Sequence, residues 1–164
     1  MQNNKELEFL TILKNKFGED ILGVRNSKPR RMYIEIEPNS LRRVISFLKN
    51  DLGFDHLSTI TGIDLGETIE LIYHLVYMNS LVLSIKIKTP KNNLKIHTIS
   101  DIYLPAELYE REIHDLLGVV FEDHPDLSRL ILPEDWPREL YPLRKDKTID
   151  QISSTLDKSE VGRE

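Results

Sequence analysis

Two glutamates in the stretch YEREIHDLLG, residues 109–118, have the side chains that acid–base catalysis needs. Such carboxyls can act as general acid and general base only if both reach the same substrate bond. The stretch is typical of the end of a helix closed by glycine, and on a helix Glu110 and Glu112 diverge by about 200°. They cannot flank one bond, so the pair does not predict catalysis.

The other candidates for catalysis or metal binding are the five histidines, His56, His74, His97, His114 and His124. They contain no HExxH motif and no other closely spaced pair of ligands, so roles within strands or on helix surfaces are favoured over metal binding. GxSxG, Walker and dinucleotide-binding patterns are also absent from the sequence. The pattern argues against an independent enzyme; the alternative is a small-molecule enzyme that uses Glu112 or His124.

Glu112 stands where the helical period expects an apolar side chain. At about 100° per residue it falls between Leu108 and Leu116. A carboxylate taken out of water without a partner costs several kcal/mol or changes its protonation state. We therefore expect Glu112 to bind the guanidinium group of Arg129 or Arg144. The alternative is that it lies at the edge of the apolar stripe and reaches water. The opposite side of the helix carries Glu110, Arg111, His114 and Asp115.

The composition suits one globular domain with tails, because 40% of the 164 residues are hydrophobic and 30% are charged. A formal net charge of -5 argues against a general nucleic-acid-binding protein. The chain has no cysteine, which excludes disulfides, iron–sulfur ligation and thiolate zinc sites within it. Without a signal-like start or a long apolar run, we expect an intracellular, soluble chain that associates with a membrane only through a partner.

The periodicity predicts an α+β fold with a mainly antiparallel sheet covered by helices. Three helices are expected. The first spans residues 5–17, the second begins after a cap at Asn39 or Ser40 and ends near Gly53, and the third has Pro105 in its first turn and ends at Gly118. Extended segments are expected over 32–37, 54–63, 68–78 and 81–88, and a short strand or turn over 94–99. The later three strands should pair sequentially and antiparallel, with one face of the sheet buried.

The chain changes character after the α+β domain of residues 1–118. Residues 119–146 contain four prolines, too many for a long helix or a central strand, so we expect an extended arm with a short helical turn after Pro125. Its apolar residues and the only tryptophan favour an arm laid over a partner, and the alternative is that it folds back over its own sheet. In residues 147–164, Ile149, Ile152 and Leu156 form a sparse stripe; this tail should be disordered alone or helical against a partner.

Three segments together resemble one protein family. They are residues 109–118, followed by Phe121, then HPDLSRLIL at 124–132, and PLRKD at 142–146. In this order and spacing they are similar to the signature of the C-subunit family of NADH-quinone oxidoreductase, respiratory complex I. The same family supplies a subunit to membrane-bound, energy-converting NiFe hydrogenases. The preceding α+β region agrees with the family only in general layout.

The resemblance implies a non-catalytic structural subunit that holds no cofactor. Its implied partners are a hydrogenase-like large subunit and a small iron–sulfur subunit, with the membrane arm contacted indirectly, at the cytoplasmic face of the cell membrane. Iron–sulfur clusters, and NiFe in the hydrogenase branch, would then belong to the partners. The residues expected at the subunit interface are Glu110, Arg111, Glu112, Asp115, His124, Pro125, Leu127, Arg129, Leu130, Trp136, Tyr141, Pro142, Leu143, Arg144, Lys145 and Asp146.

Two positions depart from the pattern that is common in complex I. Leu108 stands where tryptophan is usual, and Tyr141 precedes Pro142 where glycine-histidine is common. Together with LPEDWP at residues 132–137, these features resemble the energy-converting hydrogenase branch. The alternatives are a subunit of an NADH- or other quinone-reducing complex, and a non-respiratory adaptor that kept the fold.

Overall fold

A five-stranded sheet forms the centre of the chain, of which the computed structural model describes residues 2–78 and 80–161. The strands are β1 (Ile21–Lys28), β2 (Arg31–Ile36), β3 (His56–Asp64), β4 (Thr68–Tyr77) and β5 (Leu81–Pro90), in the order β1-β2-β5-β4-β3. β1 pairs with β2 and β3–β5 pair in sequence, all antiparallel, whereas β2 and β5 are parallel. The predicted α+β class with a mainly antiparallel sheet is confirmed.

Strand β1 is an element that the sequence pattern did not predict. Its residues, ILGVRNSK, show no sustained alternation, and register shifts interrupt its pairing with β2. A strand of this kind depends on hydrogen bonds to its neighbour more than on an apolar face of its own. The other four strands occur where extended segments were expected.

One face of the sheet is apolar and covered by helices. The strands contribute a buried set that includes Met32, Ile34, Tyr73, Leu83 and Ile85. Helix α1 (Gln2–Phe17) packs the Phe9 ring against Phe54 and Tyr77, with centroids 5.2 and 5.0 Å apart. Helix α2 (Leu41–Asn50) buries Leu41, Val44, Ile45 and Leu48. Each such side chain contributes about 1.5–3 kcal/mol through burial.

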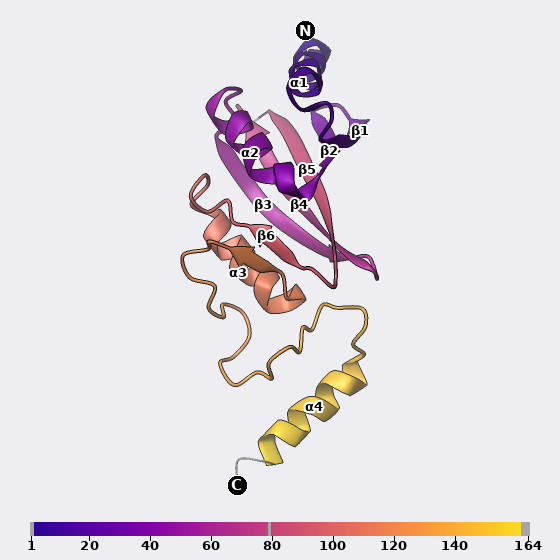
Figure 1. Ribbon diagram of the computed structural model, residues 1–164, viewed down its shortest axis with the longest axis vertical. Helices are drawn as coiled ribbons and strands as arrows, with labels where there is room; N and C mark the ends of the chain where they lie inside the picture. Colours follow the sequence, from indigo (N-terminus) through magenta and orange to yellow (C-terminus); the bar gives the residue numbers. More distant parts are fainter. Residues whose placement is uncertain (1, 79, 162–164) are drawn as a thin grey trace.

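Helix α3 (Ala106–Leu117) covers the same face over strand β3. A Cβ added at Gly62 would meet the side chains of Leu117 and Ile113, and Gly62 pairs with Leu71 of the buried set. Residues paired across neighbouring strands point to one side of a sheet, so α3 lies on the same side as α1 and α2. Within the described residues, no helix lies over the opposite face (Figure 1).

The expected cap of α2 is right in its position, because Ser40 is the N-cap residue, but Ser40 does not cap with its side chain. A 3-10 turn, Pro38–Ser40, precedes the helix, and Ser40 makes no side-chain capping bond. Its hydroxyl instead donates to Asp20 Oδ1 at 2.7 Å, which ties the start of α2 to the turn after α1.

A second, two-stranded sheet joins the segments before and after α3. Strand β6 (Lys95–His97) pairs parallel with β7 (Val120–Glu122). A short strand or turn was expected at the first position, but β7 was not predicted, because it forms by pairing with β6. Helix α3 ends at Gly118 as expected, with φ at 75°. The arm therefore starts from a fixed point beside α3.

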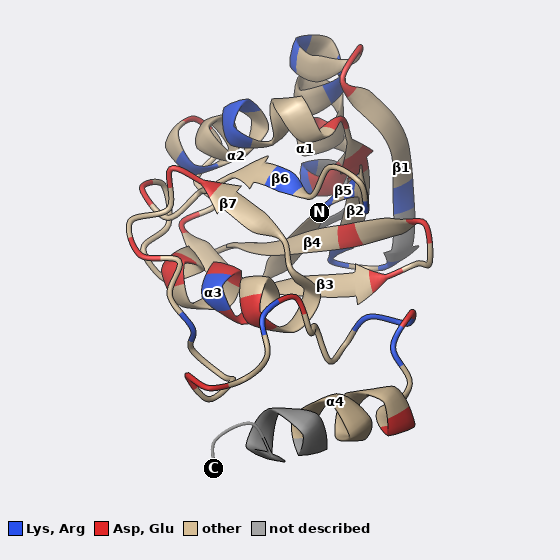
Figure 2. Cartoon of the chain, turned by 60° about the horizontal axis from the view of Figure 1, so that its bottom comes forward, with Lys and Arg blue, Asp and Glu red and all other residues tan. Residues whose placement is uncertain are grey.

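From residue 123 to residue 148 the described chain forms neither helix nor strand. The predicted helical turn after Pro125 is wrong, because its backbone amides are bound by a side chain of α3. Helix α4 (Ile149–Val161) follows and lies apart from the sheet, at the end of the molecule opposite α1 (Figures 1 and 2). The expectation that a partner orders this tail stays a prediction, as do the boundaries of the three regions.

Candidate functional site

The rotation of α3 differs from the one that its apolar residues predicted. The buried positions include Ala106, Glu110, Ile113 and Leu117, and Leu108 is 52% exposed. Glu110 is fully buried, whereas Glu112 is exposed and makes no ion pair within the described part of the chain. The prediction that Glu112 binds Arg129 or Arg144 is therefore wrong. The positions of the apolar residues could not predict the correct rotation of α3 about its axis, because Glu110 occupies a core position and Leu108 a surface position.

The Glu110 carboxyl is held by the segment that follows β6. The backbone amide of Ile99 donates to Glu110 Oε1 at 2.9 Å, and the Thr98 hydroxyl lies within hydrogen-bonding distance of Oε2. Burial raises the pKa of Glu110 to about 7, although the bonds from Thr98 and Ile99 act in the opposite direction. The carboxyl therefore links α3 to the second sheet and can gain or lose a proton near neutral pH.

His124, near the start of the arm, is also bound to α3. Its side chain is 1% exposed, and its Nε2 lies 3.8 Å from Glu110 Oε2. The amide of Asp126 donates to His124 Nδ1 at 3.1 Å, so the ring proton lies on Nε2, which donates to the Glu107 carbonyl at 3.1 Å. Both ring nitrogens are used within the chain, which gives His124 a structural role.

Asp115 fixes the next part of the arm. Its Oδ2 accepts three consecutive backbone amides, from Leu130, Ile131 and Leu132, at 2.9, 2.8 and 3.0 Å. Burial acts to raise the pKa of Asp115, but the three amides and nearby Arg129 outweigh it and lower the pKa below its usual value. The amides that a helical turn would have used are thus held by one carboxylate.

Arg111 binds the same segment from the neighbouring turn of α3. Its Nε and Nη2 donate to the Ser128 carbonyl and hydroxyl, both at 3.0 Å, and Nη2 also donates to the Arg129 carbonyl at 2.8 Å. The guanidinium of Arg129 donates to the Trp136 carbonyl at 2.9 Å. Trp136 Nε1 then donates to the Leu140 carbonyl at 2.7 Å, so the arm is braced internally as well.

The end of the arm returns to α3 at Gly118. Arg144 Nε donates to the Leu117 carbonyl at 2.7 Å, and its guanidinium lies 4.3 Å from the centre of the Tyr141 ring. A Cβ on Gly118 would lie 2.5 Å from both Arg144 Nη2 and Tyr141 Cζ. Only glycine leaves room for this return.

A buried aspartate at the end of β3 holds the last residues of the arm. Asp64 Oδ2 accepts the amide of Lys145 at 2.7 Å and lies 2.8 Å from Lys91 Nζ, which also lies 3.1 Å from Asp146 Oδ1. Burial acts to raise the pKa of Asp64, but the hydrogen bond from Lys91 and the amides of Gly66 and Lys145 lower it overall. The segment PLRKD is therefore ordered, as expected, although without Glu112.

The arm carries apolar side chains on its outer surface. Leu130, Ile131 and Leu143 are 40%, 55% and 57% exposed. Leu127, Trp136, Tyr141 and Pro142 are half-buried, and Pro125 is exposed. The arm thus follows α3 and the end of β3 and does not fold over the main sheet.

Several residues that hold the arm were missed by the sequence reasoning. These are Asp64, Lys91 and Thr98, together with Gly118, which was expected to end α3 but not to leave room for the arm. Their partners lie 12 to 81 positions away along the chain, so no local pattern could identify them. Among the described residues, no three histidine, aspartate or glutamate side chains gather to hold a metal ion, and no helix is long and apolar enough to cross a membrane.

Comparison with known families and proteins gives consistent matches. Residues 34–152 match the model of the family described as "Respiratory-chain NADH dehydrogenase, 30 Kd subunit". The C subunit of F(420)H(2) dehydrogenase from Methanosarcina mazei is 36% identical over 137 residues, which are 82% of this chain and 86% of that protein. The C subunit of NADH-quinone oxidoreductase from Chloroherpeton thalassium is 29% identical over 146 residues, 86% of this chain but 60% of that longer protein.

A solved structure matches most of the fold. A chain in the structure of the membrane-bound sulfane sulfur reductase, described as an archaeal respiratory membrane complex, superimposes with a TM-score of 0.81 at 26% identity. The match covers 93% of this chain and 92% of that one. It therefore extends beyond the central sheet into the arm.

Proposed function

Since the chain belongs to the family of the 30 kDa subunit of respiratory-chain NADH dehydrogenase, we propose that it is a non-catalytic, cofactor-free structural subunit of a complex I-related, membrane-bound oxidoreductase. Its task is to hold companion subunits in the peripheral arm of that complex. The two sequence relatives described above are subunits of oxidoreductases by name, and the solved structure described above is that of a membrane-bound complex.

The observation that carries this proposal is the way in which Asp115 fixes the arm. Three amides on one carboxylate oxygen give the backbone of residues 130–132 a set course without helix or strand. The same course leaves Leu130 and Ile131 exposed instead of burying them in the chain's own core. A rigid segment that presents apolar side chains outward loses little conformational freedom when a partner covers it.

Helix α4, which follows the arm, carries an apolar stripe of its own. Ile149 is 82% exposed, and Ile152 and Leu156 follow it at helical spacing. A short helix is stabilised mainly by packing its apolar stripe against another surface. The stripe therefore fits a groove on a companion subunit, and by resemblance the companions are a hydrogenase-like large subunit and a small iron–sulfur subunit at the cytoplasmic face of the membrane.

Within the family, Leu108 and Tyr141 favour the energy-converting hydrogenase branch over an NADH- or other quinone-reducing branch. Leu108 lies exposed on α3, where a different companion would meet a different side chain. None of these three relatives is a hydrogenase by name. The companion large subunit decides the branch: two pairs of NiFe-binding cysteines select a hydrogenase, and their loss selects a quinone- or sulfur-reducing complex.

Native purification through a tag on this chain tests the proposal. We expect a hydrogenase-like large subunit and a small iron–sulfur subunit to be recovered in fixed proportion. Asp115→Ala should lower the yield of the complex while the activity per assembled complex stays unchanged, and Glu112→Ala serves as the control on the same helix. Recovery of a stable monomer without such companions, or full assembly of Asp115→Ala with lost activity, would contradict a bracing role.

A further inference from the structure

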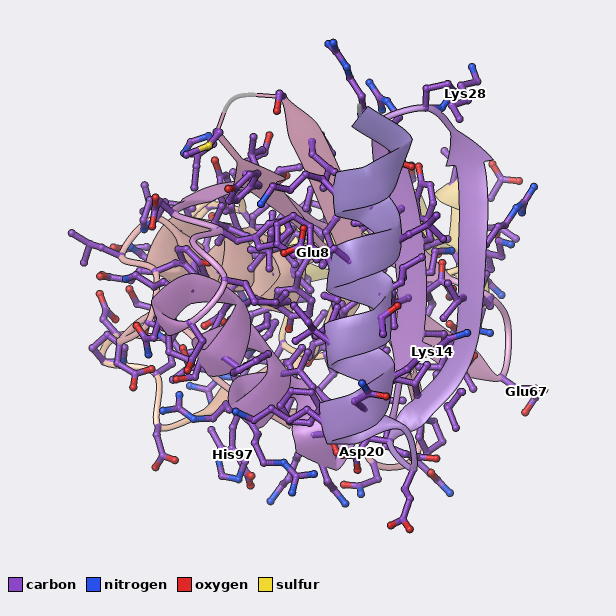
Figure 3. The ribbon with its side chains drawn as sticks, turned by 90° about the horizontal axis from the view of Figure 1, so that it is seen from above. Glu8, Lys14, Asp20, Lys28, Glu67 and His97 are labelled. Carbon is purple, nitrogen blue, oxygen red and sulfur yellow. The ribbon has the colours of Figure 1, made fainter. Side chains whose placement is uncertain are left out.

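The face of the sheet opposite the helices carries a hollow that the arm and α4 do not use. It has a volume of about 470 Å³ and lies over β1, β2, β4 and β5. The register places Arg25 of β1 opposite Tyr33 of β2, and Gly23 opposite Glu35. Figure 3 shows β1 beside α1 at the edge of the sheet, with Lys28 at its end. Because Gly23 has no side chain, this edge contributes little to fill the hollow.

The basic side chains of this face outnumber the acidic ones. Glu70 binds Lys86 at 3.2 Å, and Glu35 binds Lys88 at 2.8 Å, so both acids are already neutralised. Arg25 and Arg31 are exposed and make no ion pair within the described residues. The excess of positive charge is local, because the whole chain has a formal net charge of -5.

The strand register places the two unpaired arginines next to Tyr33, and of the two Arg25 lines the hollow itself. Arg25 pairs across the strands with Tyr33, and Arg31 precedes Tyr33 by two positions on β2, which places its side chain on the same face. Lys86 Nζ lies 5.7 Å from the centre of the Tyr33 ring. A guanidinium group binds a carboxylate through two parallel hydrogen bonds, so two arginines beside an aromatic ring suit an acidic peptide segment.

His74 responds to the charge of this face. Ser84, its partner across the strands, lies in register with Tyr33, and the His74 Nδ1 atom is 2.9 Å from Ser84 Oγ. Burial lowers the pKa of His74, and the positive charges of Arg31 and Lys86 lower it further. The pKa of His74 should therefore rise when a negatively charged group enters the hollow, and this change can be measured.

We propose that this hollow, flanked by Arg25 and Arg31 around Tyr33, is a second interaction surface that binds an acidic segment of a companion polypeptide. It lies on the face of the sheet opposite α3. The hollow is basic and would bind an acidic segment, whereas the outer surface of the arm is apolar. The chain thus binds on two faces by different chemistry. The surface exists in the isolated chain and can be measured without the rest of a complex.

Titration of the isotope-labelled full chain with an octaglutamate peptide, followed by NMR, tests this surface. Binding should shift the resonances of Tyr33 and Lys86 and raise the pKa of His74, because negative charge favours the imidazolium. The double variant R25E/R31E should bind about tenfold more weakly or worse, as expected when two cations in contact with a ligand are reversed. Lys14→Glu, an exposed charge reversal on α1, should bind as the unchanged chain does.

A second variant keeps the test independent of charge. Gly23→Trp should fill the hollow, and the backbone leaves room for a side chain to start there, because a Cβ at Gly23 meets only Glu35 Cβ at an ordinary 3.9 Å. It should block the peptide without lowering the melting temperature. The proposal is overturned if both variants bind octaglutamate normally, if octaglutamine binds equally well, or if vesicles of phosphatidylglycerol displace the peptide and bind more tightly.

Discussion

Gly118 and Tyr141 lie so close that a Cβ on the glycine would come 2.5 Å from Tyr141 Cζ. The same glycine ends α3 in the left-handed conformation, with φ at 75°. One residue therefore both stops the helix and leaves space for the returning arm. The arm is held at this point by shape as well as by hydrogen bonds.

Gly118→Ala should destabilise the chain more than the backbone conformation alone requires. Gly53 is a matched control, because its φ is also 75° but an added Cβ would meet Tyr77 atoms at ordinary distances of 3.5 and 3.9 Å. Gly53→Ala should lower the free energy of unfolding by about 1 kcal/mol. Gly118→Ala should lower it by about 2 kcal/mol or more in chemical denaturation, because Tyr141 and Arg144 must move. Equal losses at the two sites would show that the arm is not seated on Gly118.

Asp115→Ala should release the arm from α3. Three amides would lose their acceptor, and the expected cost is about 3 kcal/mol of unfolding free energy. Hydrogen exchange should quicken at the amides of Leu130, Ile131 and Leu132. Glu112→Ala, on the exposed side of the same helix, should change stability by less than about 0.5 kcal/mol. Unchanged exchange at these three amides in Asp115→Ala would mean that other contacts fix the arm.

Glu110→Gln should change how stability depends on pH. The pKa of Glu110 is about 7 when folded against 4.5 ordinarily, so the folded chain binds the extra proton between these values. The free energy of unfolding therefore falls as pH rises from 4.5 to about 7, by about 3 kcal/mol, and the full contribution is present below 4.5. Glutamine does not titrate, so the free energy of unfolding of the variant, relative to that of the unchanged chain, should increase as pH rises across this range.

The measurement for Glu110 is the difference in unfolding free energy between variant and unchanged chain at pH 5 and pH 8. Other groups, such as His74, titrate in both proteins and cancel in that difference. Glu112→Gln controls for removing a glutamate from α3. A difference that stays constant between the two pH values would show that Glu110 does not hold its proton in the folded chain.

The sequence was sufficient for the elements that carry a regular apolar period. Helices α1 and α2, strands β2 to β5 and the glycine end of α3 follow from spacing alone. Spacing failed where tertiary contacts decide the outcome. Glu110 occupies a core position because Ile99 and Thr98 supply its hydrogen bonds, and no property of α3 itself signals them. Strands β1 and β7 likewise form because a neighbouring strand is present.

The segments predicted to form the interface are ordered within the chain, but the predicted pairings are wrong, and the place of these segments at a subunit interface stays a prediction. Arg111, Asp115, Arg144 and Asp146 are ordered, and each binds a partner in or beside the arm. The proposed pair of Glu112 with Arg129 or Arg144 failed because both arginines donate to backbone carbonyls instead. A carbonyl acceptor leaves no trace in the amino-acid sequence, so charge matching alone chose the wrong partner.

Arg144→Lys should weaken the arm although it keeps the charge. Arg144 donates through Nε to the Leu117 carbonyl while its planar group lies over Tyr141, and an ammonium group on a flexible stem cannot reproduce both contacts. We expect a loss of about 1–2 kcal/mol in unfolding free energy, close to that of Arg144→Ala. Arg138→Lys is the control, because Arg138 is exposed and has no hydrogen bond or ion pair within the described residues. If Arg144→Lys matched the unchanged chain in both stability and yield of the native complex, charge alone would explain the role of Arg144, and the planar contact with Tyr141 would contribute nothing.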